Sequence, residues 1–311
     1  MSLPGGLAAR PPGRLTSRRR GHLRPRLLPY ALLAPALLVL GGMLLYPLGY
    51  VAVESFFDVA PLRHLGWGAG GLGNYRRLLH DQQVLASILR TVTWTAVSVL
   101  FQFLIGLSVA LALRRSFRGR PFIRMLLLVP WATPAVVGAL AWKWVYHGQY
   151  GLLNAVLGSF GFGGLEHAWL GDPSTALGAV IVANIWRGFP FIAVMLGAAL
   201  ANLPAELHEA AAIDGASRWQ DFRYVTLPQL RPAILLATLL AGIWTFNNFS
   251  TIYILTGGGP AGRTNILVTF VYQNGFQYFE FGYAAALSVM LFLIVLVPSV
   301  FYVRRLGEAA T

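Results

Sequence analysis

The sequence contains no cysteine, and its single lysine is Lys143. Without cysteine, disulfides, thiolate nucleophiles and cysteine-ligated metal sites are excluded. A phosphate-binding loop of the Gly-Lys-Ser/Thr type is excluded too, because Lys143 lies between Trp142 and Trp144. The six histidines show no metal-ligand spacing, so we predict no metal site. Any hydrolysis of ATP that this protein uses must take place on another polypeptide.

Charge is scarce as well. Charged residues make up 11% of the chain and hydrophobic residues 56%, with a mean hydropathy of +0.61. A soluble domain carries about 25% charged residues. A chain so poor in charge must place its apolar surface against lipid. The composition therefore predicts an integral membrane protein.

Six apolar stretches are long enough to cross a hydrocarbon core, which takes about 20 residues of helix. Several of them contain proline, which membrane bundles tolerate when neighbouring groups bind the freed carbonyls. The prediction is an all-α membrane protein with spans near residues 30–57, 87–113, 123–147, 175–201, 232–256 and 283–303.

The arginines sort by side of the membrane. Segments 1–26, 114–124, 202–231 and 304–311 carry 17 arginines, and the segments on the other side carry four. The positive-inside rule then places both termini in the cytoplasm. The net charge of +13 is thus an orientation signal, and no nucleic-acid partner is predicted. We expect a disordered basic tail over 1–26 and one transmembrane domain over 27–311.

The longest cytoplasmic loop, 202–231, predicts two short helices joined by a tight turn. Pro204 suits the first turn of a helix, and Gly215 suits the left-handed residue that ends it. Ser217 and Gln220 have the spacing of a capping box that opens a second helix, which Pro228 is expected to stop.

Three functions compete for this loop: a solvated connector, a DNA-binding helix-turn-helix and a docking element for a cytoplasmic partner. Three arginines against four carboxylates give the loop a charge of −1, whereas phosphate binding needs a positive face. Small residues allow another backbone to approach, and carboxylates offer charge to a basic partner. We favour docking through Glu209, Ala210, Ala211, Asp214 and Gly215.

The same loop carries a family resemblance. Its residues are similar to the EAA loop of binding-protein-dependent ABC importer permeases, although Val225 stands where isoleucine is usual. The matching residues are Glu209-Ala210-Ala211-x3-Gly215 and Val225-x-Leu227-Pro228. The resemblance implies that these residues contact an ATPase subunit.

Longer segments resemble the first permease subunit of maltose-type carbohydrate importers of bacterial cytoplasmic membranes. They are Pro29-YALLAPALLVL, Asn184-IWRGFPF-Ile192 and the stretch 254–297 that begins Ile254-LTGGGP. The resemblance implies a second permease subunit, two ATPase subunits that bind ATP and Mg, and an extracytoplasmic solute-binding protein. It also implies inward transport of a sugar. Alternatives are an ABC permease for another polar solute, such as a glycerol phosphate, and an ion-coupled secondary carrier.

Polar and aromatic side chains near mid-membrane are the candidates for a solute pathway. Arg187 lies in the fourth span, and Asn247 and Asn248 lie at similar depth in the fifth. Amides suit sugar hydroxyls and aromatic faces suit sugar rings, so Trp186 and Tyr253 join them. Each residue has a structural alternative, since amides also hold helices together. The aromatic run from Trp142 to Tyr146 is typical of an interfacial belt.

Overall fold

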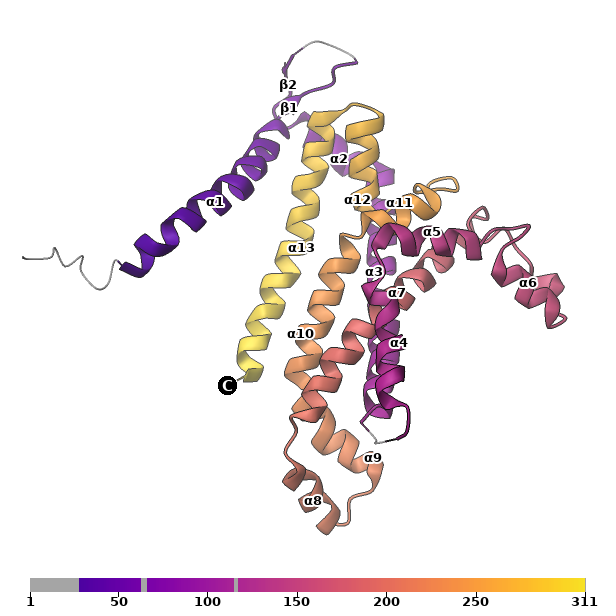
Figure 1. Cartoon of the computed structure of the whole chain (residues 1–311). Helices are drawn as coiled ribbons and strands as arrows, with labels where there is room; N and C mark the ends of the chain where they lie inside the picture. Colours follow the sequence, from indigo (N-terminus) through magenta and orange to yellow (C-terminus); the bar gives the residue numbers. More distant parts are fainter. Residues whose placement is uncertain (1–27, 63–65, 115–116, 311) are drawn as a thin grey trace, which may run out of the picture. The chain divides into compact units, whose positions relative to one another are not determined.

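The computed structural model describes residues 28–62, 66–114 and 117–310, and the predicted tail 1–26 lies outside the described residues. The chain divides into two units, one ending at Tyr50 and one beginning at Val51. The first unit holds most of α1 (Leu28–Glu54) (Figure 1). In the described residues, strands are limited to an antiparallel pair, β1 (Phe57–Asp58) with β2 (Gly68–Ala69).

The remaining helices belong to the second unit (Figure 1). They are α2 (Gly73–His80), α3 (Gln82–Ala112), α4 (Arg120–Ala132), α5 (Ala135–Val145), α6 (Leu152–Ser159), α7 (Ala176–Ala201), α8 (Ala205–Ile213), α9 (Arg218–Gln220), α10 (Leu227–Phe246), α11 (Phe249–Thr256), α12 (Leu267–Tyr272) and α13 (Phe281–Ala310). A 3-10 turn covers Gly163–Leu165, and π-helical turns cover Asp221–Thr226 and Gln273–Gln277.

Five helical segments of the described chain are long and apolar enough to span a membrane, and there are six if the bent pair α4 and α5 is counted as one span. This confirms the predicted all-α membrane fold. The third and fifth spans, however, are not continuous as expected. The axis turns by 95° between α4 and α5, and α10 and α11 are separate helices.

Both interruptions have local causes. Thr133 precedes Pro134 and is extended, at φ −68° and ψ 128°, because the proline ring disfavours the helical conformation of the residue before it. Asn248 leaves the helical region at φ −78° and ψ 81°, and its side-chain oxygen caps α11 by accepting the Thr251 N–H at 3.2 Å.

The bundle core lies where α3 and α7 run side by side. A Cβ at Gly106 of α3 would lie 2.8 Å from Cγ2 of Ile192 on α7, so glycine permits the close approach. Tyr146 is 4% exposed and donates to the Ala179 carbonyl at 3.0 Å. The predicted interfacial belt is therefore wrong for this residue, because the bend before α5 turns it into the core.

Candidate substrate cavity and coupling loop

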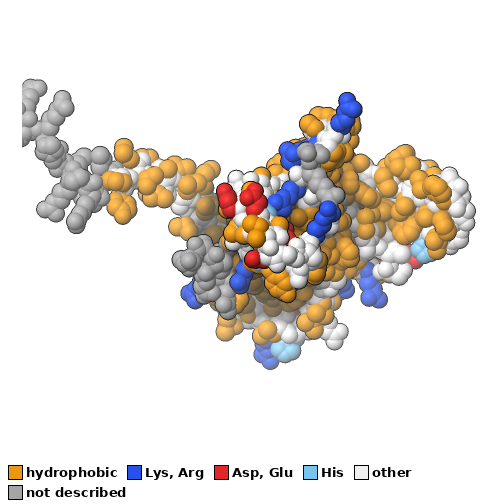
Figure 2. Space-filling view, turned by 90° about the horizontal axis from the view of Figure 1, so that it is seen from below, with side chains coloured by type: hydrophobic (Ala, Val, Ile, Leu, Met, Phe, Trp, Pro, Cys, Tyr) orange, Lys and Arg blue, Asp and Glu red, His pale blue; other side chains and the backbone are white. Residues whose placement is uncertain are grey.

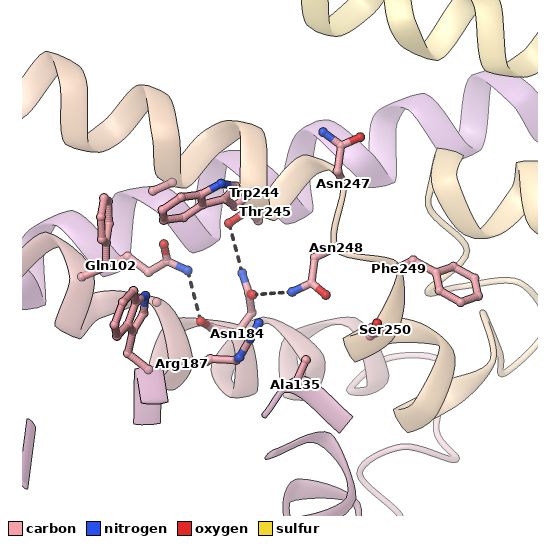
Figure 3. Close-up of a pocket in the computed structure, with 14 residues that line it drawn as sticks. Gln102, Ala135, Asn184, Arg187, Trp244, Thr245, Asn247, Asn248, Phe249 and Ser250 are labelled. Atoms are coloured by element: carbon pink, nitrogen blue, oxygen red, sulfur yellow. Dashed lines mark hydrogen bonds between the residues drawn. The ribbon is translucent and has the colours of Figure 1, made fainter. Parts of the chain in front are cut away.

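A cavity of about 480 Å³ lies at the break between α10 and α11 (Figure 3). α3, α7 and the α4–α5 bend complete its wall. It is lined by Gln102, Trp131, Ala135, Asn184, Arg187, Gly188, Phe191, Ala241, Trp244, Thr245, Asn247, Asn248, Phe249 and Ser250. Polar groups on an apolar wall suit a small hydroxylated solute.

A chain of amides holds the cavity wall together. Asn248 Nδ2 donates to Asn184 Oδ1 at 3.0 Å, and Asn184 Nδ2 donates to Thr245 Oγ1 at 3.4 Å (Figure 3). Gln102 Nε2 donates to the Asn184 carbonyl at 3.1 Å. Because Asn184 is 5% exposed, these bonds satisfy polar groups that water would reach poorly. Asn184 is thus the hub that joins α3, α7, α10 and α11.

Arg187 and Asn247 both bring to the cavity polar atoms that are left for a ligand. The Nε of Arg187 is buried and has no hydrogen-bond partner among the described residues. Asn247 is exposed and turns to the opposite side from Asn248, and its Nδ2 donates to the Ile243 carbonyl at 2.9 Å (Figure 3). The described part of the chain gives its Oδ1 no donor. A buried unpaired donor is costly, so Arg187 has a physical reason to bind an acceptor.

The structure brings together only some of the predicted pathway residues. Arg187, Asn247 and Asn248 line one cavity. Trp186 does not line it; its ring meets Trp142 edge-on at 5.8 Å. Tyr253 stacks on Phe249 at 4.8 Å and borders a different cavity beside Lys143. The shared depth of the first three residues was visible in the sequence, whereas side-chain direction was not.

Sequence reasoning missed Gln102, Asn184 and Thr245. Gln102 is 2% exposed in the middle of α3, and a Cβ at Gly188 would collide with its side chain. Glycine at 188 is what lets the Gln102 amide lie against α7. A lone glutamine inside an apolar span was the available signal, because polar residues in membrane helices mark interior contacts.

The α8–α9 loop has the predicted helix-turn-helix form. Gly215 has φ 78°, and the N–H groups of Gly215 and Ala216 donate to Ala212 and Ala211 at 3.1 and 2.9 Å. This is the Schellman arrangement that closes a helix on a left-handed residue. A Cβ at Gly215 meets nothing within 4 Å in this chain, so the glycine is needed for its backbone angle.

The second helix of the loop begins as predicted and ends differently. Ser217 N donates to Gln220 Oε1 at 2.7 Å and Gln220 N donates to Ser217 Oγ at 3.3 Å, which completes the capping box. Pro228 does not stop this helix. A π-helical turn, in which Leu227 N donates to the Phe222 carbonyl, leads directly into α10. Pro228 lies in the first turn of α10, where the missing N–H of proline is tolerated.

The loop presents apolar side chains that nothing in the described chain covers. Ile213 is 87% exposed, Trp219 69% and Tyr224 72%. Glu209, Ala210, Asp214, Gly215 and Pro228 are also exposed, while Ala211 and Leu227 are half-buried. His208 Nδ1 lies 2.7 Å from Asp221 Oδ1 and joins the two helices. Large exposed apolar side chains on a rigid turn are typical of a protein contact.

Comparison with known proteins places the chain in a family. Residues 102–304 match the family model described as binding-protein-dependent transport system inner membrane component. The chain is 37% identical to the trehalose/maltose transport system permease protein MalF of Thermococcus litoralis, over 75% of this chain and 78% of that protein. It is 33% identical to the diacetylchitobiose uptake system permease protein DasB of Streptomyces coelicolor, over 96% and 90%.

The fold has a solved counterpart. A bacterial ABC transporter involved in the import of the acidic polysaccharide alginate contains a chain that superimposes with a TM-score of 0.76 at 22% identity, covering 90% of this chain and 95% of that one. At that identity the likeness speaks for the fold alone. The family model and the two relatives carry the assignment, and this chain belongs to the binding-protein-dependent transport system inner membrane components, the permease subunits of ABC transporters.

Proposed function

We propose that this permease moves a sugar, mono- or oligosaccharide, into the cell across the cytoplasmic membrane. The observation that carries the proposal is the cavity at the α10–α11 break, where amides and an unpaired guanidinium face an apolar wall. The named substrates of the two relatives, trehalose or maltose and diacetylchitobiose, are sugars. Family membership also decides against the ion-coupled carrier.

Within the cavity, Asn247 and Arg187 are the proposed hydrogen-bonding groups for sugar hydroxyls. Trp244 is 51% exposed at the same wall and offers an aromatic surface to the ring. Asn248 is assigned a structural function, because its Nδ2 donates to Asn184 and its Oδ1 caps α11. We place Trp186 and Tyr253 outside direct contact with the solute.

Coupling to ATP hydrolysis is proposed to run through the α8–α9 loop. In this account an ATPase subunit receives Ile213, Trp219 and the Glu209–Gly215 segment, and a second permease subunit completes the pathway. The family description supports a binding protein as donor of the solute. Because α10 continues from the loop without interruption, movement of α9 is transmitted directly to the helix that ends at the cavity.

The transport test is uptake by cells that produce the permease together with its ATPase and its binding protein. Radiolabelled trehalose, maltose, diacetylchitobiose and glycerol 3-phosphate are offered in turn. We expect uptake of one of the three sugars, with a raised KM in Asn247→Ala and unchanged membrane abundance. Uptake of glycerol 3-phosphate alone, with loss in Arg187→Gln, would support the second candidate, an anionic polar solute that pairs with Arg187.

Orientation is tested by single cysteines, which the chain makes possible because it has none of its own. We propose that the α8–α9 loop and both termini face the cytoplasm. An impermeant thiol reagent applied to intact cells should label Ser159→Cys and leave Ser217→Cys unlabelled. The reverse pattern would place the loop outside and remove it as an ATPase contact.

A further inference from the structure

A second cavity, of about 650 Å³, lies at the end of the bundle near α8. We call it the arginine groove, and it is defined by α4, α7 and the end of α3. Three arginines at its rim meet a long apolar wall. The lining residues that carry the inference are Arg114, Arg120, Arg124, Leu127, Leu128 and Val194.

The positive charge at the rim is without an ion-pair partner among the described residues. In the described part of the chain no carboxylate lies within 4 Å of Arg114, Arg120 or Arg124. Arg120 and Arg124 are four residues apart on one helix face, where like charges destabilise the helix. The Nε of Arg120 is buried and donates to no acceptor among the described residues. The rim is therefore suited to binding an anion whose oxygen atoms accept hydrogen bonds from the arginines.

The backbone adds to this demand. Arg120 is the first residue of α4, and Gly119 before it provides no side-chain cap. The Arg120 N–H donates to the Phe117 carbonyl and Pro121 has no N–H, so what the start of α4 offers an anion is mainly the positive end of its dipole. Arginines beside that positive end are unfavourable unless an anion is bound. Figure 2 looks onto this end of the molecule and shows basic side chains beside apolar surface, with acidic side chains next to some of the basic ones near the middle of the face.

The apolar wall identifies the source of the anion. Leu127 and Leu128 of α4, which belongs to the bent pair, and Val194 of the candidate span α7 continue the groove along both helices. A free phosphate would gain nothing from that wall, but an acyl chain would. The positive-inside rule alone does not explain why three arginines line one groove. An arginine anywhere in the loop satisfies that rule, and Arg118 lies in the same loop without lining the groove.

We infer that the arginine groove binds an anionic phospholipid, with the phosphate at Arg114, Arg120 and Arg124 and one acyl chain along Leu127, Leu128 and Val194. Basic pockets between membrane helices on the cytoplasmic side are suited to such headgroups. Naming the cytoplasmic leaflet rests on the proposed orientation. The binding itself does not depend on the transported solute.

The test measures lipid retained by the assembled transporter. The complex is reconstituted in nanodiscs of phosphatidylcholine with or without phosphatidylglycerol, re-extracted, and examined by native mass spectrometry. Arg120→Gln with Arg124→Gln removes two charges and keeps hydrogen-bonding side chains, and Arg118→Gln is the matched control. We expect preferential retention of phosphatidylglycerol, weakened about fivefold for each arginine removed from the rim and unchanged in the control.

A second pair of variants tests the acyl-chain part of the groove. A Cβ atom added at Gly197 or at Gly178 of α7 meets nothing within 4 Å, but of the two glycines only Gly197 lines the groove. Gly197→Leu should therefore reduce retention of phosphatidylglycerol, and Gly178→Leu should not.

Four results would overturn the inference. They are equal retention of the two lipids, wild-type retention in the double arginine variant, binding of inorganic phosphate in place of lipid, and loss of the second permease subunit in Gly197→Leu. The last would show that the groove is a subunit contact. ATP hydrolysis stimulated by the sugar and its binding protein is measured in the same nanodiscs, so failure of the lipid site and failure of the transport proposal are distinguishable.

Discussion

The α8–α9 loop and the cavity at the α10–α11 break differ in the sequence separation of the residues whose hydrogen bonds hold them together. In the loop, each hydrogen bond that sets the turn joins residues a few positions apart, from Ala211 to Gln220. At the cavity, Gln102 meets Asn184 across 82 positions and Asn184 meets Asn248 across 64. The loop is formed by local rules, whereas the cavity exists only once four helices have packed. Substitutions should accordingly act on partner binding in one region and on bundle packing in the other.

The largest effect is expected at Gly215. Gly215→Asp adds a φ > 0 cost of about 1 kcal/mol and a charge that the proposed ATPase contact would have to desolvate. Membrane insertion should be normal, while co-purification of the ATPase subunit and sugar uptake should fall to background. The measurement is the amount of ATPase retained by tagged permease beside uptake in the same cells.

Gly161→Asp is the matched control, because Gly161 also has positive φ and open space around it but lies in another loop. It should retain the ATPase at the wild-type ratio. Equal retention in both variants would reduce the α8–α9 loop to a connector.

The next largest effect is expected at Gly188, where the cavity depends on close packing. Gly188→Ala places a methyl group against the Gln102 side chain, and overpacking of this kind costs about 1–3 kcal/mol. Thermal stability of the purified transporter and uptake should both fall, while ATPase binding persists. Gly178→Ala on the same helix should be neutral, because its added methyl meets nothing within 4 Å.

The double variant Gly188→Ala with Gln102→Ala sharpens this test. Shortening Gln102 removes the collision, so stability should recover toward that of Gln102→Ala alone. If the two changes are additive, the contact between Gln102 and Gly188 does not shape the cavity wall.

A smaller effect separates the two functions of Asn248. Asn248→Asp keeps an oxygen for the Thr251 N–H and loses the donor to Asn184, whereas Asn248→Ala loses both. Loss of a cap costs about 1 kcal/mol, and a hydrogen bond between membrane helices is worth about 0.6 kcal/mol. Melting of the purified transporter should rank wild type above Asn248→Asp, and Asn248→Ala lowest. Equal melting of the two variants would mean that the cap contributes nothing.

The smallest effect is expected from the capping box. Ser217→Ala removes the acceptor for the Gln220 N–H at a cost of about 1 kcal/mol confined to α9. Hydrogen exchange of that amide should accelerate, and uptake should change little. Ser217→Asp restores an acceptor and should restore protection; if it does not, the box does not stabilise α9.

The sequence predicted the spans and the loop because long apolar runs and capping residues act locally. It did not predict that Pro134 bends the third span, since proline is also tolerated inside membrane helices, as Pro190 is in α7. Burial of Tyr146 follows from that bend. The hub function of Asn184 was hidden for another reason, because its partners lie on other helices.

A thiol at position 247 tests whether the α10–α11 break forms the solute site. Asn247→Cys introduces the chain's only thiol at the cavity. Its rate of modification by a small thiol reagent is measured in the assembled transporter during turnover, with and without the transported sugar and its binding protein. We expect the sugar to slow modification at Asn247→Cys and to leave modification of Ser159→Cys on α6 unchanged. Equal modification rates at Asn247→Cys with and without a sugar that the same transporter takes up would contradict this expectation.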